Sequence, residues 1–449
     1  MPPDRLFGPI FGTEAMLEVV SDTAWVQAML DVEAAAARAE ARVGVIPAGA
    51  AGAIAACCDA ARFDVAQIGR EAAASLSPVI PLVRALTAAA PEEAARYVHW
   101  GLTSQDVLDT AMMLIAARGL DLLVQDLDGV ADACAELADR HRGTVMPGRT
   151  LLQQALPVTF GLKAAGWLIA VLEARDHLAT LRRERLAVQC GGAVGTLAAL
   201  APQGLAVVRE LGAELGLAEP VIPWHTSRRR VAELGTALGL TAGAMGKIAL
   251  DVALLTQSEV GEVAEPDSSG GQGSSTMPQK RNPVRAVTVN ACVRGVHAQV
   301  GVLLGAMLQE HERAAGGWQA EWEALGEALR LTSGAVARTR ELLEDLEVDE
   351  ERMRVNVGLT RGMLLSEAVM MALAERTGRL QALELVRAAA QRADRTGREL
   401  REELLADLTI RSHLQPDEID AALDPKSYLG AAGELVDRAV AAHRARRST

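Results

Sequence analysis

The 449-residue sequence has little of what marks sheets, disulfides or nucleic-acid binding. Aromatic residues make up 3% of the chain, and alternating runs of β-branched residues are scarce, so few strands are expected. Acidic residues outnumber basic ones by 58 to 45, giving a net charge of −13, and this excess argues against a nucleic-acid partner. The five cysteines have no zinc-site spacing, which predicts buried free thiols and no metal site.

The sequence also lacks targeting and membrane signals. No run of about 18 uncharged apolar residues occurs. The N-terminus, "MPPDRLFGPIFGTEAM", has no basic segment followed by an apolar one. We therefore expect no signal peptide, no membrane span and a cytoplasmic location.

What the chain does contain is helical periodicity. Between Arg230 and Val263, apolar residues recur at spacings of three, four and seven without a proline, which predicts a helix of about 30 residues. Pro157–Cys190 and Pro283–Glu312 show the same pattern after a proline suited to a first helical turn. Rods of this length predict an all-α fold built as an elongated bundle.

Breaks in the helical pattern suggest three parts. We predict an N-terminal helical domain over 1–111, a central long-helix domain over 112–350 and a C-terminal helical domain over 351–449.

Three polar stretches interrupt the helices. The first, "HWGLTSQD" from His99 to Asp106, places hydroxyls and a carboxylate where they could cap a helix or contact a ligand. The second, "PGRTLLQQALP" from Pro147 to Pro157, sets a cation beside a hydroxyl, and a solvated helix start would explain it equally well. The third, "GGQGSSTMPQKRNP" over 270–283, is rich in glycine and serine.

The third stretch has the chemistry of a binding loop. Its glycines permit positive φ or a close approach to a ligand, and N–H groups around Ser274 and Ser275 could form an anion-binding concavity. Lys280, Arg281 and Asn282 add cations and an amide. A linker would share the glycine and serine but has no use for "MPQKRNP" leading directly into a long helix, so a functional loop is favoured.

This loop resembles the signature of the fumarase/aspartase superfamily, GSS-x-MP-x-K-x-NP, which the sequence matches from Gly273 to Pro283. "GLTSQD" and "GRTLLQQALPVTFG" are similar to the superfamily's first and second signature regions. "IPWHTSRRRVAEL" and "QEHERAAGGWQAEWEAL" resemble its branch of bacterial 3-carboxy-cis,cis-muconate cycloisomerases. The resemblance implies a homotetramer with a central helical core, active sites shared between three subunits, a small carboxylate substrate and no cofactor.

The resemblance also implies roles for the signature residues. Members of the superfamily eliminate or add a group next to a carboxylate, through a dianionic intermediate that needs prearranged cations and amides. The implied catalytic residues are Ser274 and Ser275. His99, just before the first signature, is either a substrate contact or a helix-cap hydrogen-bond partner, and we count it with them. The expected substrate contacts are Thr103, Ser104, Arg149, Thr150, Gln153, Lys280 and Asn282. Arg228 is added because a third carboxylate could be gripped bidentately by an arginine of "PWHTSRRR".

One departure from the superfamily pattern bears on the substrate. Many members read GRTH in the second region, with the histidine assigned to protonating the leaving group, whereas this sequence has Leu151. A carboxylate leaves without a proton because the pKa of its acid is near roughly 4. The predicted reaction is therefore cycloisomerisation of 3-carboxy-cis,cis-muconate to carboxymuconolactone, in protocatechuate catabolism.

Three alternatives stay open. The nearest is a lyase that releases fumarate and a stable anion such as nitrite, from nitrosuccinate. An enzyme like adenylosuccinate lyase is disfavoured by the missing histidine. A non-catalytic structural homologue is disfavoured by the intact Ser274, Lys280 and Asn282.

Overall fold

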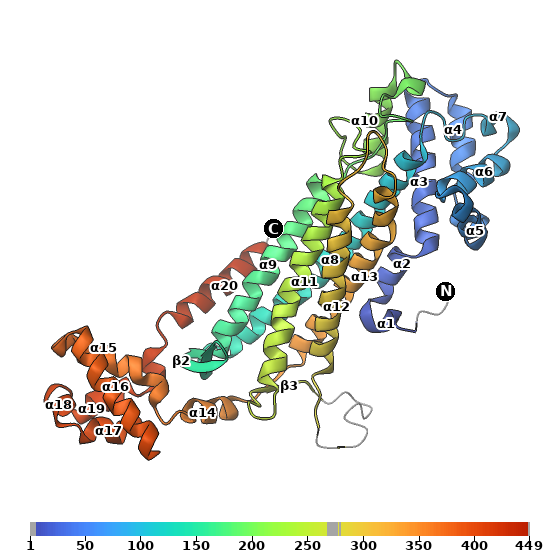
Figure 1. Ribbon diagram of the computed structural model, residues 1–449. Helices are drawn as coiled ribbons and strands as arrows, with labels where there is room; N and C mark the ends of the chain where they lie inside the picture. The colour runs from blue at the N-terminus through green and yellow to red at the C-terminus, as the bar shows by residue number, and fades with distance from the viewer. Residues whose placement is uncertain (1–5, 267–276, 278–279, 448–449) are drawn as a thin grey trace. The chain divides into compact units, whose positions relative to one another are not determined.

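The computed structural model describes residues 6–266, 277 and 280–447, and these fold mostly into helices (Figure 1). The predicted helical class is therefore confirmed. The part of the chain that the structure describes also contains two small antiparallel sheets, β1–β2 and β3–β4.

The elements follow one another in an order that starts with short helices. The first half comprises α1 Gly8–Phe11, α2 Glu14–Val19, α3 Asp22–Arg42, α4 Ala48–Ala55, α5 Val65–Ser75, α6 Val79–Ala89, α7 Glu92–Ala95, α8 Ser104–Arg140, β1 Val145–Thr150, β2 Gln153–Thr159, α9 Phe160–Glu184 and α10 Gly204–Leu215. The second half comprises α11 Arg229–Leu255, β3 Val263–Ala264, α12 Val284–Gly305, α13 Gly317–Glu344, β4 Glu347–Val348, α14 Glu350–Gly358, α15 Ser366–Thr377, α16 Arg379–Thr396, α17 Leu400–Ala406, α18 Leu408–His413, α19 Pro416–Ala422 and α20 Ala432–Arg447. Four 3₁₀ turns lie at Ala60–Arg62, Ala198–Leu200, Met363–Leu365 and Pro425–Tyr428.

The chain divides into two compact units, each made of segments that are separate in the sequence. Unit 1 consists of Met1–Asp128, Glu173–Gly246 and Thr288–Arg338; unit 2 consists of Gly129–Leu172, Lys247–Val287 and Thr339–Thr449. The sequence predicted three consecutive domains instead, and its boundary between 111 and 112 falls inside α8. That division stays a prediction.

The periodicity read from the sequence locates the buried face of α11. All seven apolar residues that carry the pattern are at most 5% exposed: Val231, Leu234, Leu238, Met245, Ile248, Val252 and Leu255. The helix ends at Leu255, eight residues before the predicted end at Val263. Burial of this apolar face contributes most of the stability of such a helix, because intrinsic helix propensity alone is weak.

Small residues let the long helices of unit 1 approach closely. A Cβ on Gly235 of α11 would lie 2.6 Å from Leu303 Cδ1 of α12. A Cβ on Gly295 of α12 would lie 2.6 Å from Leu331 Cδ1 of α13. Because a side chain at either position would force a leucine to shift, α11, α12 and α13 pack with leucines set against glycine backbone (Figure 1).

Helices α11 and α12 leave much of their apolar surface exposed. By length and composition alone, α11 and α12 could each cross a membrane, and the number rises to three if the bent pair Glu350–Gly358 and Met363–Thr377 is taken as one span. Only 44% of the apolar window of α11 and 22% of that of α12 are buried. Exposed apolar side chains on them are Leu240, Leu250, Val284, Val287, Val302 and Leu304. The sequence-based expectation of no membrane span required a run of apolar residues without any charge. The present test is less strict, because it allows up to two charged residues in a window of 18.

Unit 2 has a core of its own among the C-terminal helices. Leu373 of α15, Val386 of α16 and Leu404 of α17 are at most 4% exposed and belong to one apolar cluster.

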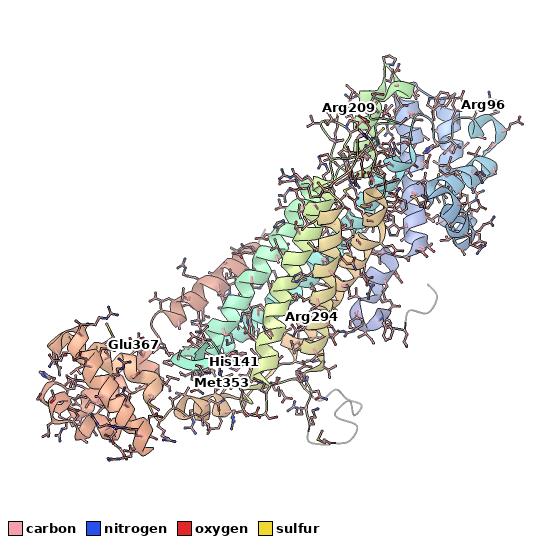
Figure 2. The ribbon with its side chains drawn as sticks, viewed as in Figure 1. Arg96, His141, Arg209, Arg294, Met353 and Glu367 are labelled. Atoms are coloured by element: carbon pink, nitrogen blue, oxygen red, sulfur yellow. The ribbon has the colours of Figure 1, made fainter. Side chains whose placement is uncertain are left out.

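His141, labelled in Figure 2, lies after α8, where its Nδ1 is 3.1 Å from Glu350 Oε1 and its ring packs edge-on against Phe160. These contacts give His141 a structural role.

The predicted rods were wrong at their ends. The helix expected over 157–190 is α9, which starts only after Thr159 of strand β2. The helix expected over 283–312 ends at Gly305. The stretch over 147–157 is strand and turn, and not the start of a helix.

Candidate active site

The first signature stretch caps the N-terminus of α8. The backbone N–H of Thr103 donates a hydrogen bond to Asp106 Oδ2 at 3.0 Å, and the Thr103 carbonyl accepts the N–H of Asp106. This reciprocal arrangement satisfies backbone groups that a helix start leaves unpaired. It places Ser104 as the first residue of the helix. The capping role expected for Asp106 is therefore confirmed.

Asp106 also fixes a second glycine-containing segment. Its carboxylate accepts hydrogen bonds from the N–H groups of Gly191 and Gly192, at 3.0 and 2.9 Å, and lies 2.7 Å from His225 Nε2. Gly192 has φ +69°, a conformation that side-chain-bearing residues rarely adopt. Asp106 is fully buried, so it organises the "CGGAVG" segment around the first signature. The sequence analysis missed this segment, although three glycines within six residues were a usable signal.

His99 is held by a buried carboxylate. Its Nδ1 lies 2.6 Å from Oε1 of Glu33, which is 2% exposed. Burial by itself lowers the pKa of His99, but the charge and hydrogen bond of Glu33, together with Asp106, outweigh it and raise the pKa above its ordinary value. His99 is therefore bound to Glu33 and influenced electrostatically by Asp106, and is not a simple cap.

Arg313 is a cation of this network that the sequence analysis did not single out. Its Nη1 donates to Thr103 Oγ1 at 3.0 Å and its Nη2 donates to the Ala193 carbonyl at 2.9 Å. Both acceptors are neutral. Thr103 thus has an arginine against its hydroxyl, next to the segment that Asp106 holds.

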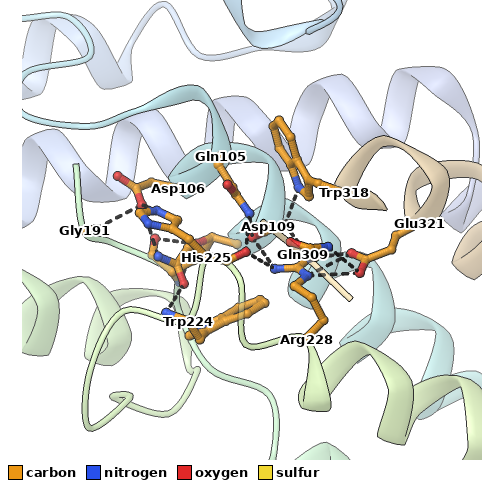
Figure 3. Close-up of polar contacts among 12 residues, drawn as sticks. Gln105, Asp106, Asp109, Gly191, Trp224, His225, Arg228, Gln309, Trp318 and Glu321 are labelled. Atoms are coloured by element: carbon orange, nitrogen blue, oxygen red, sulfur yellow. Dashed lines mark hydrogen bonds and ion pairs between the residues drawn. The ribbon is translucent and has the colours of Figure 1, made fainter. Parts of the chain in front are cut away.

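Arg228 lies in a buried cluster of charged side chains. Figure 3 shows its guanidinium between Asp109 and Glu321, and all three side chains are fully buried. Nη1 and Nη2 donate to Asp109 at 2.7 and 2.9 Å, and Nη2 donates to Glu321 Oε2 at 2.5 Å. The face of the guanidinium lies 4.9 Å from the ring centroid of Trp224. With its donors bound to two carboxylates, Arg228 links α8 and α13 at the start of α11, and its contact with substrate stays a prediction.

Glu321 has an unusual protonation equilibrium within this cluster. Burial raises its pKa to about 7, although Arg228 acts in the opposite direction. Trp318 Nε1 donates to Asp109 Oδ1 at 2.9 Å, and Gln105 Nε2 donates to Asp109 Oδ2 at 3.1 Å. Gln309 Nε2 donates to Glu321 Oε1 at 3.3 Å. Each carboxylate therefore has a partner besides the arginine, as buried charges require.

The second signature stretch, in unit 2, is a β-hairpin. Strands β1 and β2 pair Thr150 with Gln153 and Arg149 with Gln154. Arg149 donates to both oxygens of Glu262, at 2.9 and 2.7 Å, and Glu262 is fully buried. Arg149 therefore anchors the hairpin instead of presenting a free cation. Thr150 and Gln153 are exposed side by side next to the turn.

The turn of this hairpin consists of two leucines. Leu151 and Leu152 have φ +50° and +65° and are 96% and 77% exposed. Positive φ at both central residues is the type I′ geometry, which favours Asn-Gly and disfavours branched side chains. The position at which many superfamily members have histidine is thus an exposed aliphatic tip.

The third signature stretch is described only in part. Ser274 and Ser275, the predicted catalytic serines, lie outside the described residues. Lys280 is exposed and Asn282 is half-buried, just before α12 begins at Val284. Oxygens of Glu265 accept the N–H groups of Arg285 and Ala286 at 3.0 and 2.9 Å, which caps the helix that follows the loop.

The predicted site residues therefore fall into two groups. In unit 1, Thr103 bonds Asp106, Ser104 begins α8 next to it, and His99 bonds Glu33 and is influenced electrostatically by Asp106. In unit 2, Thr150 and Gln153 are neighbours across a turn, and Lys280 and Asn282 precede α12. Glu33, Asp106 and Arg313 are the additions that the geometry makes to the sequence-based set.

The chain is mostly helical, has a polar network at the start of one long helix and has a glycine-rich sequence before another. These features are typical of a helical lyase. Comparison with known proteins agrees: residues 11–300 match the family described as Lyase, and residues 362–439 match the family described as adenylosuccinate lyase C-terminus. The chain belongs to this lyase family, within the fumarase/aspartase superfamily.

Individual relatives span nearly the whole chain. It is 48% identical to a 3-carboxy-cis,cis-muconate cycloisomerase of Bradyrhizobium diazoefficiens, over 96% of this chain and 97% of that protein. It is 44% identical to a nitrosuccinate lyase of Streptomyces davaonensis, over 97% and 94%. The crystal structure of 3-carboxy-cis,cis-muconate lactonizing enzyme from Pseudomonas putida superposes with a TM-score of 0.93 at 43% identity, covering 99% and 100%.

Proposed function

We propose that this protein catalyses the cycloisomerisation of 3-carboxy-cis,cis-muconate to carboxymuconolactone, in the cytoplasm. The observation that carries the proposal is the aliphatic turn at Leu151, which removes the proton donor that other leaving groups need. Relatives with the cycloisomerase name at 48% identity support it. The five cysteines, all described and all free thiols, support the location.

The reaction is an isomerisation that takes up one proton. An oxygen of one substrate carboxylate adds to the diene and forms the lactone C–O bond. The electron pair of the attacked double bond moves toward a neighbouring carboxylate, which becomes a dianionic aci-carboxylate. The Ser274 hydroxyl then gives its proton to the α-carbon and recovers one from water.

Charge in this mechanism develops on the carboxylate next to the carbon that is protonated. Lys280 and Asn282 near the serine loop, with Thr103 and Ser104 from the first stretch, are the groups we assign to that carboxylate. Arg313 enters this set because its guanidinium bonds Thr103 Oγ1. In the reverse direction the ring carboxylate is a leaving group that needs no protonation, so a leucine at 151 costs the reaction nothing.

A fumarate-releasing lyase is the second candidate. A relative named nitrosuccinate lyase is 44% identical over nearly the full length, and nitrite is also a leaving group that is stable as an anion. The same leucine therefore fits both reactions, and substrate turnover must separate them.

The test is a spectrophotometric assay with two substrates. Purified enzyme should remove the ultraviolet absorbance of the 3-carboxy-cis,cis-muconate diene, and a Ser274→Ala variant should not. Release of nitrite and fumarate from nitrosuccinate, with no change in the muconate, would overturn the cycloisomerase assignment in favour of the second candidate.

We further propose that the enzyme is a homotetramer whose active sites combine stretches from three subunits. The apolar surface exposed on α11 and α12 supports a partner chain of the same kind, because helices with only 44% and 22% of their apolar windows buried need a cover. A membrane is the other possible cover, and the behaviour of the protein without detergent distinguishes the two.

Assembly and site sharing can be tested together. Light scattering on the detergent-free protein should give four times the mass of the chain. Co-expression of two inactive variants, Ser274→Ala and Thr103→Val, should then restore activity, because mixed tetramers contain some sites without either change. A monodisperse monomer, or no recovery in mixed tetramers, would refute the shared site.

A further inference from the structure

A buried ion pair lies just ahead of the first signature stretch, and the reaction described above assigns it no step. Glu33 is in the middle of α3, and its Oε1 is 2.6 Å from His99 Nδ1. The Glu33 side chain is 1% exposed, whereas that of His99 is 20% exposed. His99 also has φ +58°, a conformation that costs energy for a residue other than glycine and persists where the surroundings require it.

The contact determines which ring nitrogen of His99 is available. An ionised carboxylate only accepts hydrogen bonds, so Nδ1–H is the donor and Nε2 remains for another partner. A carboxylate this buried also needs a positive partner, because removing a lone charge from water is costly. Both requirements are met when the ring is an imidazolium, with Nδ1–H on Glu33 and Nε2–H left for another partner on a side chain that is 20% exposed.

The charges around the ring favour the same state. Glu33 from α3 and Asp106 from α8 are the charged groups that act on His99, and both stabilise a proton on it. Asp106 is itself bound to His225 and to two backbone N–H groups. Arg313 bonds Thr103, four residues from His99.

We propose that Glu33 is a positioning residue that holds His99 as an imidazolium whose Nε2–H binds a carboxylate of the substrate. The inference rests on the proposed function to the extent that the substrate is a polycarboxylate. It gives the first stretch a cation for a substrate carboxylate, whereas the donors of Arg228 are bound to Asp109 and Glu321.

The experiment compares Glu33→Gln, Glu33→Asp and His99→Gln with the wild type across pH 6 to 9. In the wild type, kcat/KM should fall as the pH rises through the pKa of His99, since only the protonated ring binds. Glu33→Gln keeps the shape of the side chain but removes its charge, so this fall should move to lower pH. At pH 7.5 its KM should rise about 10- to 100-fold, the usual worth of a charged hydrogen bond, with a smaller change in kcat. Glu33→Asp should retain part of the effect.

Glu40→Gln is the matched control. Glu40 lies seven residues further along α3 and is 1% exposed, and its carboxylate is not among the groups that act on His99. The variant should keep the wild-type KM and pH profile. Thermal unfolding of every variant checks that it is folded.

Binding of a non-reacting ligand separates this inference from the reaction itself. Isothermal titration with 3-carboxyadipate, a saturated tricarboxylate, should show weaker binding to Glu33→Gln and His99→Gln and a similar loss in the double variant. This holds whichever reaction the enzyme catalyses, so failure of the muconate assay leaves it intact. Unchanged affinity and an unchanged pH profile in folded Glu33→Gln would overturn the proposal.

Discussion

Removing the Arg228 side chain tests whether the three-charge cluster is structural. The guanidinium is fully buried and donates to Asp109 and Glu321 at distances of 2.5 to 3.1 Å. Arg228→Met keeps most of the volume and the apolar contact with Trp224 but leaves two carboxylates without their cation. Breaking a buried pair by removing one partner costs about 3–5 kcal/mol, and we expect a loss of unfolding free energy in that range.

Arg229→Met is the control at the next position. Its side chain is 73% exposed and bonds Glu233 on the same helix, so the substitution should change the free energy of unfolding by no more than about 0.5 kcal/mol. Both variants should be unfolded with urea at one protein concentration, because the stability of an assembly depends on concentration.

A third variant tests whether the unpaired carboxylates of Asp109 and Glu321 cause the loss of stability in Arg228→Met. Asp109→Asn and Glu321→Gln, added to Arg228→Met, remove the unpaired carboxylates and should recover part of the loss. The loss in Arg228→Met should also be smaller at pH 5 than at pH 8, because Glu321, whose pKa is already about 7, takes up a proton at the lower pH. A loss equal to that of Arg229→Met, together with a raised KM, would refute the structural role and restore the substrate-binding one.

Further predictions follow from single contacts. Glu40 has its pKa raised from 4.5 to about 8 by burial and by Glu33, so the contribution of Glu40 to stability should be greatest below pH 4.5 and fall by up to roughly 5 kcal/mol as the pH rises to 8. Glu40→Gln should flatten that part of a plot of urea midpoint against pH, and an unchanged slope would contradict the assignment. Arg149→Met should cost about 3–5 kcal/mol in the same urea assay, because it strands the buried Glu262. Leu151→His should leave kcat/KM for the muconate within about threefold, since the reaction needs no acid there, and a rise of more than about tenfold would argue otherwise. Dialysis against a chelator should leave activity unchanged, and a loss reversed by a divalent cation would contradict the metal-free mechanism.

The sequence predicted the parts of the site that local rules determine. Asp106 caps α8 because a carboxylate three residues after Thr103 can reach back to its N–H. The apolar stripe of α11 was located residue by residue, because 3.6-residue periodicity follows directly from burying one face.

The hairpin could not be predicted in this way. Its turn has leucines at 151 and 152 in a conformation that normally calls for Asn-Gly, so no turn signal is present. The bond between Arg149 and Glu262 that anchors it joins residues more than a hundred positions apart. Long-range partners of this kind are invisible to periodicity and propensity.

The same limit explains why the ion pairs of Arg228 were not predicted. Three consecutive arginines look alike in sequence, and which of them enters the core depends on partners on other helices. Arg228 meets Asp109 and Glu321, whereas Arg229 stays exposed. A basic cluster in an acidic protein was therefore a sound reason to expect a local function, but its first arginine neutralises buried carboxylates.

The ion pairs of these arginines reduce the number of positively charged side chains that could bind a tricarboxylate substrate. Arg149 and Arg228, both assigned to substrate from sequence, are bound to buried glutamate or aspartate side chains. Within the ranges that the structure describes, Lys280 and Arg313 lie in no ion pair, and Arg313 bonds only neutral oxygens. Protonated His99 is a third positive group, and the carboxylate of Glu33 offsets part of its charge. Among these three groups, the imidazole of His99 is the one whose ordinary pKa lies near neutral pH. Substrate affinity should therefore decline as the pH rises, with the dependence expected for the loss of one proton. A decline that follows the loss of two or more protons would mean that another titrating group takes part.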